Sequence, residues 1–149
     1  MLNIFNKTKA KAGLVGIYTT PENLTLAHIV HRNGSPELVH FEEVPAAGAK
    51  ERTKALGDLV QKLNLEGAKA SFVLSPNDYK LLLVEAPAVE RDEMAGAIKW
   101  KIKDLVSHPV EEMAITVFDV PEDAYRSQAD MIYAVAARKA KILDVIELV

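Results

Sequence analysis

The order in which hydrophobic periodicities follow one another constrains the fold of this chain more than any other feature of its 149 residues. In the first half, apolar side chains alternate with polar ones in three successive runs, as in half-buried strands. The turn signal Asn-Gly-Ser-Pro at 33–36 separates the second run from the third. Leucines at helical spacing follow, and then another short apolar run. The expected elements are strands at 12–18, 23–31 and 37–44, a helix at 46–63 and a strand at 70–74.

A different order begins after the turn residues 75–78. A dense apolar strand precedes a helix, which His108 and Pro109 end because proline cannot continue it. Two further strands and a last helix complete the chain. The expected elements are a strand at 81–84, a helix at 90–106, strands at 113–120 and 131–137, and a helix at 139–149.

These two orders predict a mixed α+β and α/β fold with two lobes. The first lobe reads β-β-β-α-β, with its first three strands in an antiparallel meander, and the second reads β-α-β-β-α. The expected divisions are a basic N-terminal arm at 1–11, a first lobe at 12–80 and a small lobe at 81–149. The last helix reaches the final residue without a capping glycine, so we expect the chain to be a piece of something longer.

Composition excludes several classes of function. The net charge of −3 gives no electrostatic footprint for nucleic acid, and the absence of cysteine excludes disulfides and thiolate metal sites. No apolar run reaches the length that spans a bilayer. The arm joins the apolar residues 2–5 to three lysines, which leaves two interpretations: peripheral contact with an anionic membrane, or a solvated arm.

The helix expected at 90–106 carries the only tryptophan. At about 100° per residue, a core stripe contains Met94, Ile98, Ile102 and Leu105, and Trp100 projects from the opposite side. Two interpretations stay open for Trp100: it packs beneath the neighbouring lobe, or it anchors a partner in a groove.

Other candidate chemistry is weak. His28 and His31 point to opposite faces of one strand and cannot share a metal ion. The carboxylates of Glu90, Asp92 and Glu93 lie in the first turn of the expected helix, where negative charge interacts favourably with the helix dipole. This interpretation is better supported than a pair of catalytic acids. The chain has no Walker loop, no Gly-x-Gly-x-x-Gly and no nucleophile elbow.

Three runs resemble the PilM family, which comprises actin-like pilus-assembly proteins related to the cell-division protein FtsA. They are Ala-Ile-Lys-Trp at 97–100, Val-Ser-His-Pro-Val-Glu-Glu at 106–112, and residues 133–143. The runs at 78–87 and 121–126 are most similar to the MshI-like branch, which serves mannose-sensitive haemagglutinin (MSHA) pili. The resemblance covers residues 12–149 and implies an incomplete actin-like lobe of ribonuclease-H type, followed by the small SHS2-like lobe of FtsA and PilM.

The resemblance also implies a function. The chain would be a cytoplasmic adaptor at the inner face of the inner membrane. Its partner would be the cytosolic N-terminal segment of a PilN-like bitopic inner-membrane protein, held as an extended peptide on apolar side chains. The expected partner-binding residues are Leu81, Leu83, Ile98, Trp100, Ile102, Tyr133 and Val135.

The first hairpin bears on nucleotide binding. Family members that bind ATP carry an acidic residue and a glycine there, with hydroxyl residues at the tip. The corresponding residues here are Gly16, Tyr18, Thr19 and Thr20: Tyr18 replaces the acid, and Pro21 removes an amide donor. We therefore expect no bound ATP or Mg²⁺ and no ATPase activity. Two alternatives to the adaptor stay open: an actin-like ATP-binding protein or ATPase, and a structural domain that assembles with itself as a homo-oligomer.

Overall fold

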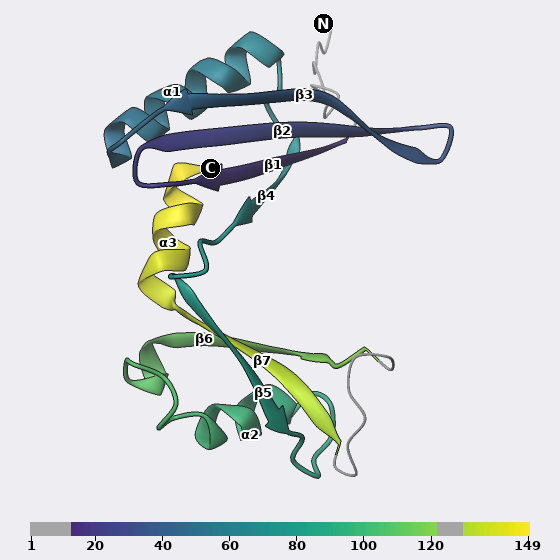
Figure 1. Ribbon diagram of the computed structural model, residues 1–149, viewed down its shortest axis with the longest axis vertical. Coiled ribbons are helices and arrows are strands. Elements are labelled where there is room, and N and C mark those ends of the chain that lie inside the picture. The colour runs from purple at the N-terminus through teal and green to yellow at the C-terminus, as the bar shows by residue number, and fades with distance from the viewer. Residues whose placement is uncertain (1–12, 122–129) are drawn as a thin grey trace, which may run out of the picture. The chain divides into compact units, whose positions relative to one another are not determined.

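In a computed structural model, which describes residues 13–121 and 130–149, the chain forms two compact units (Figure 1). Unit 1 contains the described residues up to Ser75 together with Glu147–Val149, and unit 2 is Pro76–Ile146. The basic arm at 1–11 and most of the loop at 121–130 lie outside the described residues. The border expected between residues 80 and 81 falls inside the first strand of unit 2.

Unit 1 is a four-stranded sheet with one helix. The strands lie in the order β3-β2-β1-β4; β1 to β3 are antiparallel, which confirms the meander, and β4 runs parallel to β1. The elements are β1 (Leu14–Thr19), β2 (Asn23–Arg32), β3 (Ser35–Pro45), α1 (Ala49–Leu63) and β4 (Lys69–Val73).

Local chemistry sets the turns of unit 1. Asn33 and Gly34 form the two-residue loop between β2 and β3, and both have positive φ, at 54° and 80°. This is the conformation that Asn-Gly adopts in a tight hairpin. Helix α1 begins after Gly48, whose N–H donates to the Glu51 carboxylate at 2.8 Å, and ends at Asn64 in the left-handed region.

Helix α1 covers one face of the unit 1 sheet. Its Leu56 and Leu59 belong to the same buried cluster as Ile17 of β1 and Leu26 of β2. Ile17 and Leu26 are cross-strand partners, so the alternation seen in the sequence produces this core directly. His28 continues the buried face of β2 and is 6% exposed.

Unit 2 is a three-stranded antiparallel sheet in the order β5-β7-β6. Its core consists of side chains from all three strands and from α2. The elements are β5 (Tyr79–Glu85), α2 (Met94–Lys101), a 3-10 turn η1 (Val110–Glu112), β6 (Met113–Asp119), β7 (Met131–Arg138) and α3 (Lys139–Leu148), whose last two residues count with unit 1. Both predicted element orders, and the mixed α/β class, are confirmed.

The helix predicted at 90–106 is shorter than expected. Only Met94–Lys101 is helical, and residues on both sides form turns. No side chain caps the first turn, where Glu93 stands at the N-cap, and Gly96 weakens the interior. Ile102 leaves the helical conformation at φ −98°, ψ 1°. Because the chain turns there, Leu105 is 51% exposed, and the prediction that it lies in the core is wrong.

Candidate functional site

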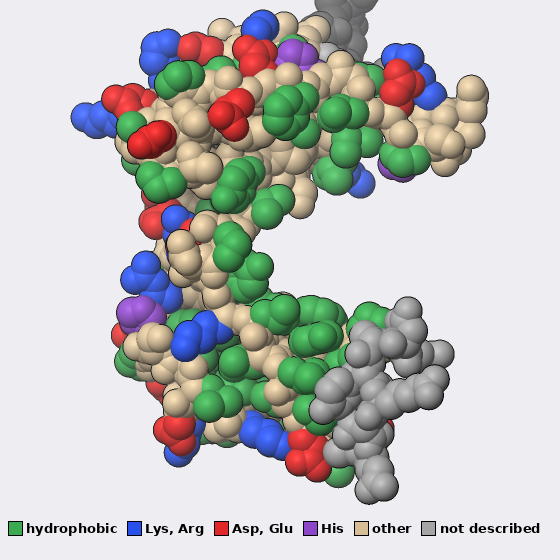
Figure 2. All heavy atoms as spheres, viewed as in Figure 1, with side chains coloured by type: hydrophobic (Ala, Val, Ile, Leu, Met, Phe, Trp, Pro, Cys, Tyr) green, Lys and Arg blue, Asp and Glu red, His purple; other side chains and the backbone are tan. Residues whose placement is uncertain are grey.

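One face of the unit 2 sheet is exposed and apolar. Strand register sets Leu83 beside Tyr133 and Phe118 in one row across β5, β7 and β6, and Leu81 beside Val135 and Thr116 in the next. Alternation places all six on the face that does not hold the core of unit 2. We call these six residues the open face. Figure 2 shows hydrophobic side chains gathered over the strands of unit 2.

The open face contains four of the seven predicted partner-binding residues. Leu81 is 51% exposed and Leu83 is 38% exposed, while Tyr133 and Val135 are half-buried. Sequence reasoning missed Phe118, which stacks on Tyr133 with ring centroids 5.2 Å apart. The alternation of β6 contains that signal, since Met113, Ile115 and Val117 occupy the other face.

The outer edge of β5 adds unpaired backbone groups to the open face. Just after β5, the Ala86 N–H donates to the Asp130 carbonyl at 2.8 Å. In an antiparallel pair, every second residue directs both backbone groups toward the partner strand, so Val84 and Leu82 face β7. The N–H and C=O groups of Leu81 and Leu83 therefore point outward. Among the described residues, no backbone hydrogen bond takes them up. An extended peptide can pair with such an edge.

Ion pairs lie near the two ends of β5. Lys101 Nζ lies 3.7 Å from the Glu85 carboxylate and donates to the Glu85 carbonyl at 2.9 Å. Near the start of β5, Lys141 lies 3.3 Å from Asp78. Along β5, the apolar residues of the open face therefore lie between charged groups, as the apolar centre of a protein interface does.

The other three predicted partner-binding residues lie elsewhere. Ile98 and Ile102 are 0% exposed and belong to the core of unit 2, on the opposite side of the sheet from the open face. Trp100 is 63% exposed, with Lys99 Nζ 5.8 Å from the centre of its ring. The helix carries Trp100 away from Ile98 and Ile102, so the seven residues do not form one surface.

The β1–β2 turn bonds internally. The Thr20 hydroxyl accepts the backbone N–H of Asn23 at 2.9 Å and that of Glu22 at 3.3 Å. From α1, the Arg52 guanidinium donates to the carbonyls of Thr20 at 2.7 Å and Pro21 at 3.2 Å. Gly16, Tyr18 and Thr19 lie in β1, before the tip. Of the four nucleotide-loop positions, only Thr20 lies in this compact turn, where its hydroxyl and its carbonyl have partners within the chain.

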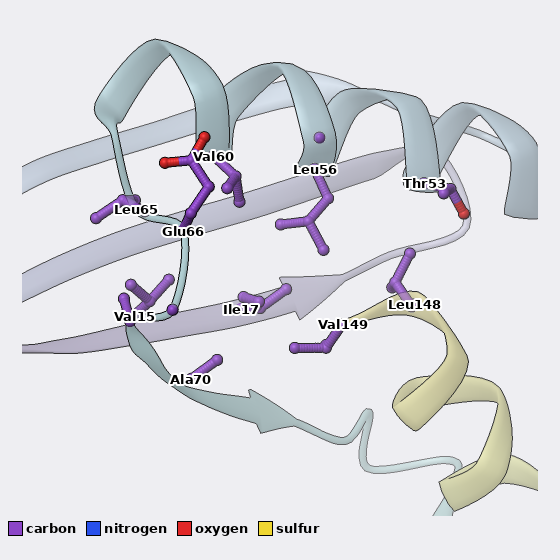
Figure 3. A pocket seen from close by; sticks show the side chains of 13 residues that line it. Val15, Ile17, Thr53, Leu56, Val60, Leu65, Glu66, Ala70, Leu148 and Val149 are labelled. Carbon is purple, nitrogen blue, oxygen red and sulfur yellow. The ribbon is translucent and has the colours of Figure 1, made fainter. Parts of the chain in front are cut away.

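A cavity of about 440 Å³ opens in unit 1 between α1 and the strands β1 and β4 (Figure 3). Leu56 and Val60 line it from α1, and Val15 and Ile17 from β1. The side chains of Leu148 and Val149 line one end, and Leu148, which is partly buried, packs against the core of unit 1. The walls are mostly aliphatic, so the cavity favours an apolar occupant.

Charged groups in the described residues do not form a metal centre. No cluster of three or more His, Asp or Glu side chains within 13–121 and 130–149 has the geometry to hold a metal ion. Among the described residues, Glu42 of unit 1 is the carboxyl whose pKa is clearly shifted: hydrogen bonds from Lys62 and His40 lower it. That group supports the fold and is remote in sequence from the open face.

Within the described residues, no helix has the length and apolar character needed to cross a bilayer. No protein-family model and no curated protein matches this sequence.

Solved structures do resemble the chain. A PilM–PilN type IV pilus biogenesis complex matches with a TM-score of 0.72 at 18% identity, over 92% of this chain and 44% of that chain. The cytoplasmic domain of EpsL, an inner-membrane component of the type II secretion system of Vibrio cholerae, matches with a TM-score of 0.66 at 10% identity. That match covers 92% of this chain and 52% of the EpsL chain. This chain therefore spans about half the length of the proteins it resembles, and it shares their fold.

Proposed function

We propose that this protein is a cytoplasmic adaptor of a type IV pilus assembly platform, at the inner face of the inner membrane. Its partner in this proposal is the cytosolic N-terminal segment of a PilN-like bitopic inner-membrane protein. The observation that carries the proposal is the open face of unit 2, where exposed leucines and a stacked aromatic pair lie beside an unpaired strand edge. The likeness to a chain solved in a PilM–PilN complex supports the choice of partner.

The mode of binding follows from two properties of β5: the outward backbone groups at its edge and the apolar side chains that it adds to the open face. An extended segment that pairs with the outward backbone groups of Leu81 and Leu83 places alternate side chains over the open face. Hydrogen bonds along the edge supply affinity that depends little on sequence, and the rows around Tyr133 and Phe118 select apolar side chains. The segment therefore needs apolar residues at every second position.

We assign the protein to the MSHA-type branch of pilus systems. The residues at 78–87, which include most of β5, and the run at 121–126 support this assignment, because they resemble MshI-like proteins most closely. Nucleotide hydrolysis is not part of the proposed function. The bonded state of the Thr20 hydroxyl and the presence of Tyr18 where relatives carry an acid support that exclusion.

Calorimetric titration with a synthetic peptide copying the cytosolic N-terminus of the adjacent PilN-like protein tests the proposal. We expect saturable binding in the micromolar range, weakened at least about tenfold by Leu81→Ser, because a polar group on the open face removes an apolar contact. Leu38→Ser is the matched control, since Leu38 is an exposed leucine of β3 in unit 1, at 58% against 51% for Leu81. Equal affinity of Leu81→Ser and wild type, with both folded, contradicts the assignment of the site.

Trp100 fluorescence is not a suitable readout for this titration. Trp100 lies on α2, and α2 packs on the face of the sheet opposite the open face. Calorimetry measures the binding itself and does not depend on the position of a fluorophore, and Leu81→Ser assigns it to the open face.

A further inference from the structure

The outer side of α2 and the turn after it expose apolar and basic side chains that the proposed function does not use. Trp100 is 63% exposed and Leu105 is 51% exposed, although both are bulky apolar residues. Lys103 lies between them in the sequence and is exposed, and Lys99 stands over the Trp100 ring. We call Lys99, Trp100, Lys103 and Leu105 the Trp100 surface.

Charge on this segment is predominantly positive. Lysine occupies 99, 101 and 103, and Asp104 is the single acid between residues 94 and 110. Lys101 is engaged with Glu85, whereas Lys99 lies over the indole and Lys103 follows Trp100 by three residues. The acids Glu90, Asp92 and Glu93 precede α2, at the end of the helix away from Lys103.

We propose that the Trp100 surface binds an anionic lipid membrane. A tryptophan that projects from a convex helix favours the headgroup level of a bilayer, where its ring is apolar and its N–H stays solvated. Lysines on either side contact anionic headgroups through long stems that keep the charge in water. Two lysines and one indole bind weakly and reversibly, so the contact is peripheral.

This surface is separate from the open face. Ile98 and Ile102, on the inner side of the same segment, bury their side chains in the core of unit 2. The core lies between the Trp100 surface and the sheet, and the open face is on the far side of that sheet. Lipid and partner peptide therefore bind opposite sides of unit 2 without competing for residues.

The single tryptophan makes the test direct. The full chain is titrated with phosphatidylglycerol vesicles and, in parallel, with phosphatidylcholine vesicles, while Trp100 emission and co-sedimentation are recorded. We expect a saturable blue shift with the anionic vesicles alone, abolished in about 1 M salt, where the Debye length falls to about 3 Å. Lys99→Glu with Lys103→Glu should weaken binding by about 25-fold or more, since each lysine near such a surface contributes roughly fivefold.

A matched variant separates a specific surface from net charge. Lys50→Glu with Lys69→Glu changes the charge equally at two exposed lysines of unit 1 and should leave vesicle binding within about twofold. Equal loss in both double variants overturns the proposal, because binding then depends on net charge. Melting curves of each variant exclude unfolding as the cause.

Two other outcomes also overturn the proposal. Vesicle binding that survives Lys99→Glu with Lys103→Glu but is lost when residues 2–11 are deleted assigns membrane contact to the basic arm. A blue shift of Trp100 emission with poly-glutamate, and no shift with vesicles, assigns the surface to an acidic protein partner. Trp100→Phe, followed by co-sedimentation, should retain most of the binding if the aromatic ring enters the interface, and Trp100→Ser should lose it.

Discussion

Phe118 and Tyr133 stack across adjacent strands, with their ring planes at 30° and their centroids 5.2 Å apart. They are direct register partners of β6 and β7, and Leu83 extends the row on the other side of Tyr133. Because Phe118 stays 43% exposed, this aromatic pair contributes less to folding than a fully buried pair would. Its apolar surface is free for a partner, and this makes it the natural centre of the open face.

Replacement of Phe118 should separate binding from stability. We expect Phe118→Ala to reduce partner-peptide affinity by about 2 kcal/mol, roughly 30-fold, as for an aromatic anchor. The free energy of unfolding should fall by only about 1 kcal/mol, since the ring is already partly in water. Calorimetry and urea denaturation measure the two effects. Phe41→Ala, on the 61% exposed Phe41 of β3, is the control that should leave affinity unchanged.

Truncation on the two sides of α2 should change the free energy of unfolding by very different amounts. Ile98→Ala leaves a cavity in the core of unit 2 and should cost about 2–5 kcal/mol. Trp100→Ala removes a larger but exposed side chain and should change the free energy of unfolding by less than about 0.5 kcal/mol. Denaturation followed by circular dichroism compares them. A larger loss for Trp100→Ala would show that Trp100 is packed and not free.

Glu42 should make unit 1 sensitive to acid. Lys62 donates to both Glu42 oxygens, at 2.9 Å and 2.8 Å, and lowers the pKa of the carboxyl below its ordinary value of 4.5, with a smaller effect from His40. Because the folded pKa is the lower one, this contribution is fully present above about pH 4.5 and disappears as the pH falls through the folded pKa. Glu42→Gln should therefore be less stable than wild type at neutral pH and nearly equal to it in acid.

Urea midpoints of the two proteins, measured from pH 7 down to pH 3, check this prediction. Lys62→Met is the reciprocal variant and should show the same convergence, because it removes the main donor to Glu42. A difference between Glu42→Gln and wild type that stays constant over the whole range would assign the effect to packing and not to ionisation.

Two glycines should respond to alanine with opposite sign. At Gly13, φ is 118° and an added Cβ would lie 2.2 Å from the Ile29 carbonyl oxygen, so Gly13→Ala should destabilise unit 1 by about 2 kcal/mol or more. Gly57 lies inside α1, and an added Cβ meets nothing within 4 Å. Gly57→Ala should stabilise by about 0.5–1 kcal/mol. Thermal denaturation of both variants measures the contrast; stabilisation by Gly13→Ala would mean that the strand entry differs from the one described.

Nucleotide should leave the stability of the chain unchanged. A ligand at a hundredfold excess over its dissociation constant raises the free energy of unfolding by about 2.7 kcal/mol. We expect Mg-ATP at a few millimolar to give no shift in melting temperature, since the Thr20 hydroxyl already accepts two backbone N–H groups. A shift with Mg-ATP that AMP does not reproduce would restore the actin-like nucleotide-binding alternative.

Local signals in the sequence determine much of this fold. Asn33 and Gly34 specify a two-residue hairpin, and the alternation along β2 separates its buried side chains from the others. The spacing of Leu56 and Leu59 likewise identified the face of α1 that packs on the sheet. The parallel pairing of β4 with β1 is set by contacts distant in the sequence, which periodicity does not contain.

The candidate site was harder to predict for the same reason. Alternation sets Leu81 and Leu83 on one face of β5, and Tyr133 and Val135 on one face of β7. Which face of the sheet is covered depends on where α2 packs. Apolar character alone does not distinguish Ile98, in the core, from an exposed side chain such as Leu105. Alternation sets Phe118 on the outer face of β6, but its position beside Tyr133 follows only from the register between β6 and β7.

The position of α2 on one side of the unit 2 sheet has a consequence for avidity. In the two proposals above, a bitopic partner and the bilayer that holds it engage opposite sides of unit 2. The first contact to form confines the protein near the second target, which converts the second association into an intramolecular step with a raised effective concentration. Two interactions that are individually weak then combine into a stable attachment, and loss of either one releases the adaptor.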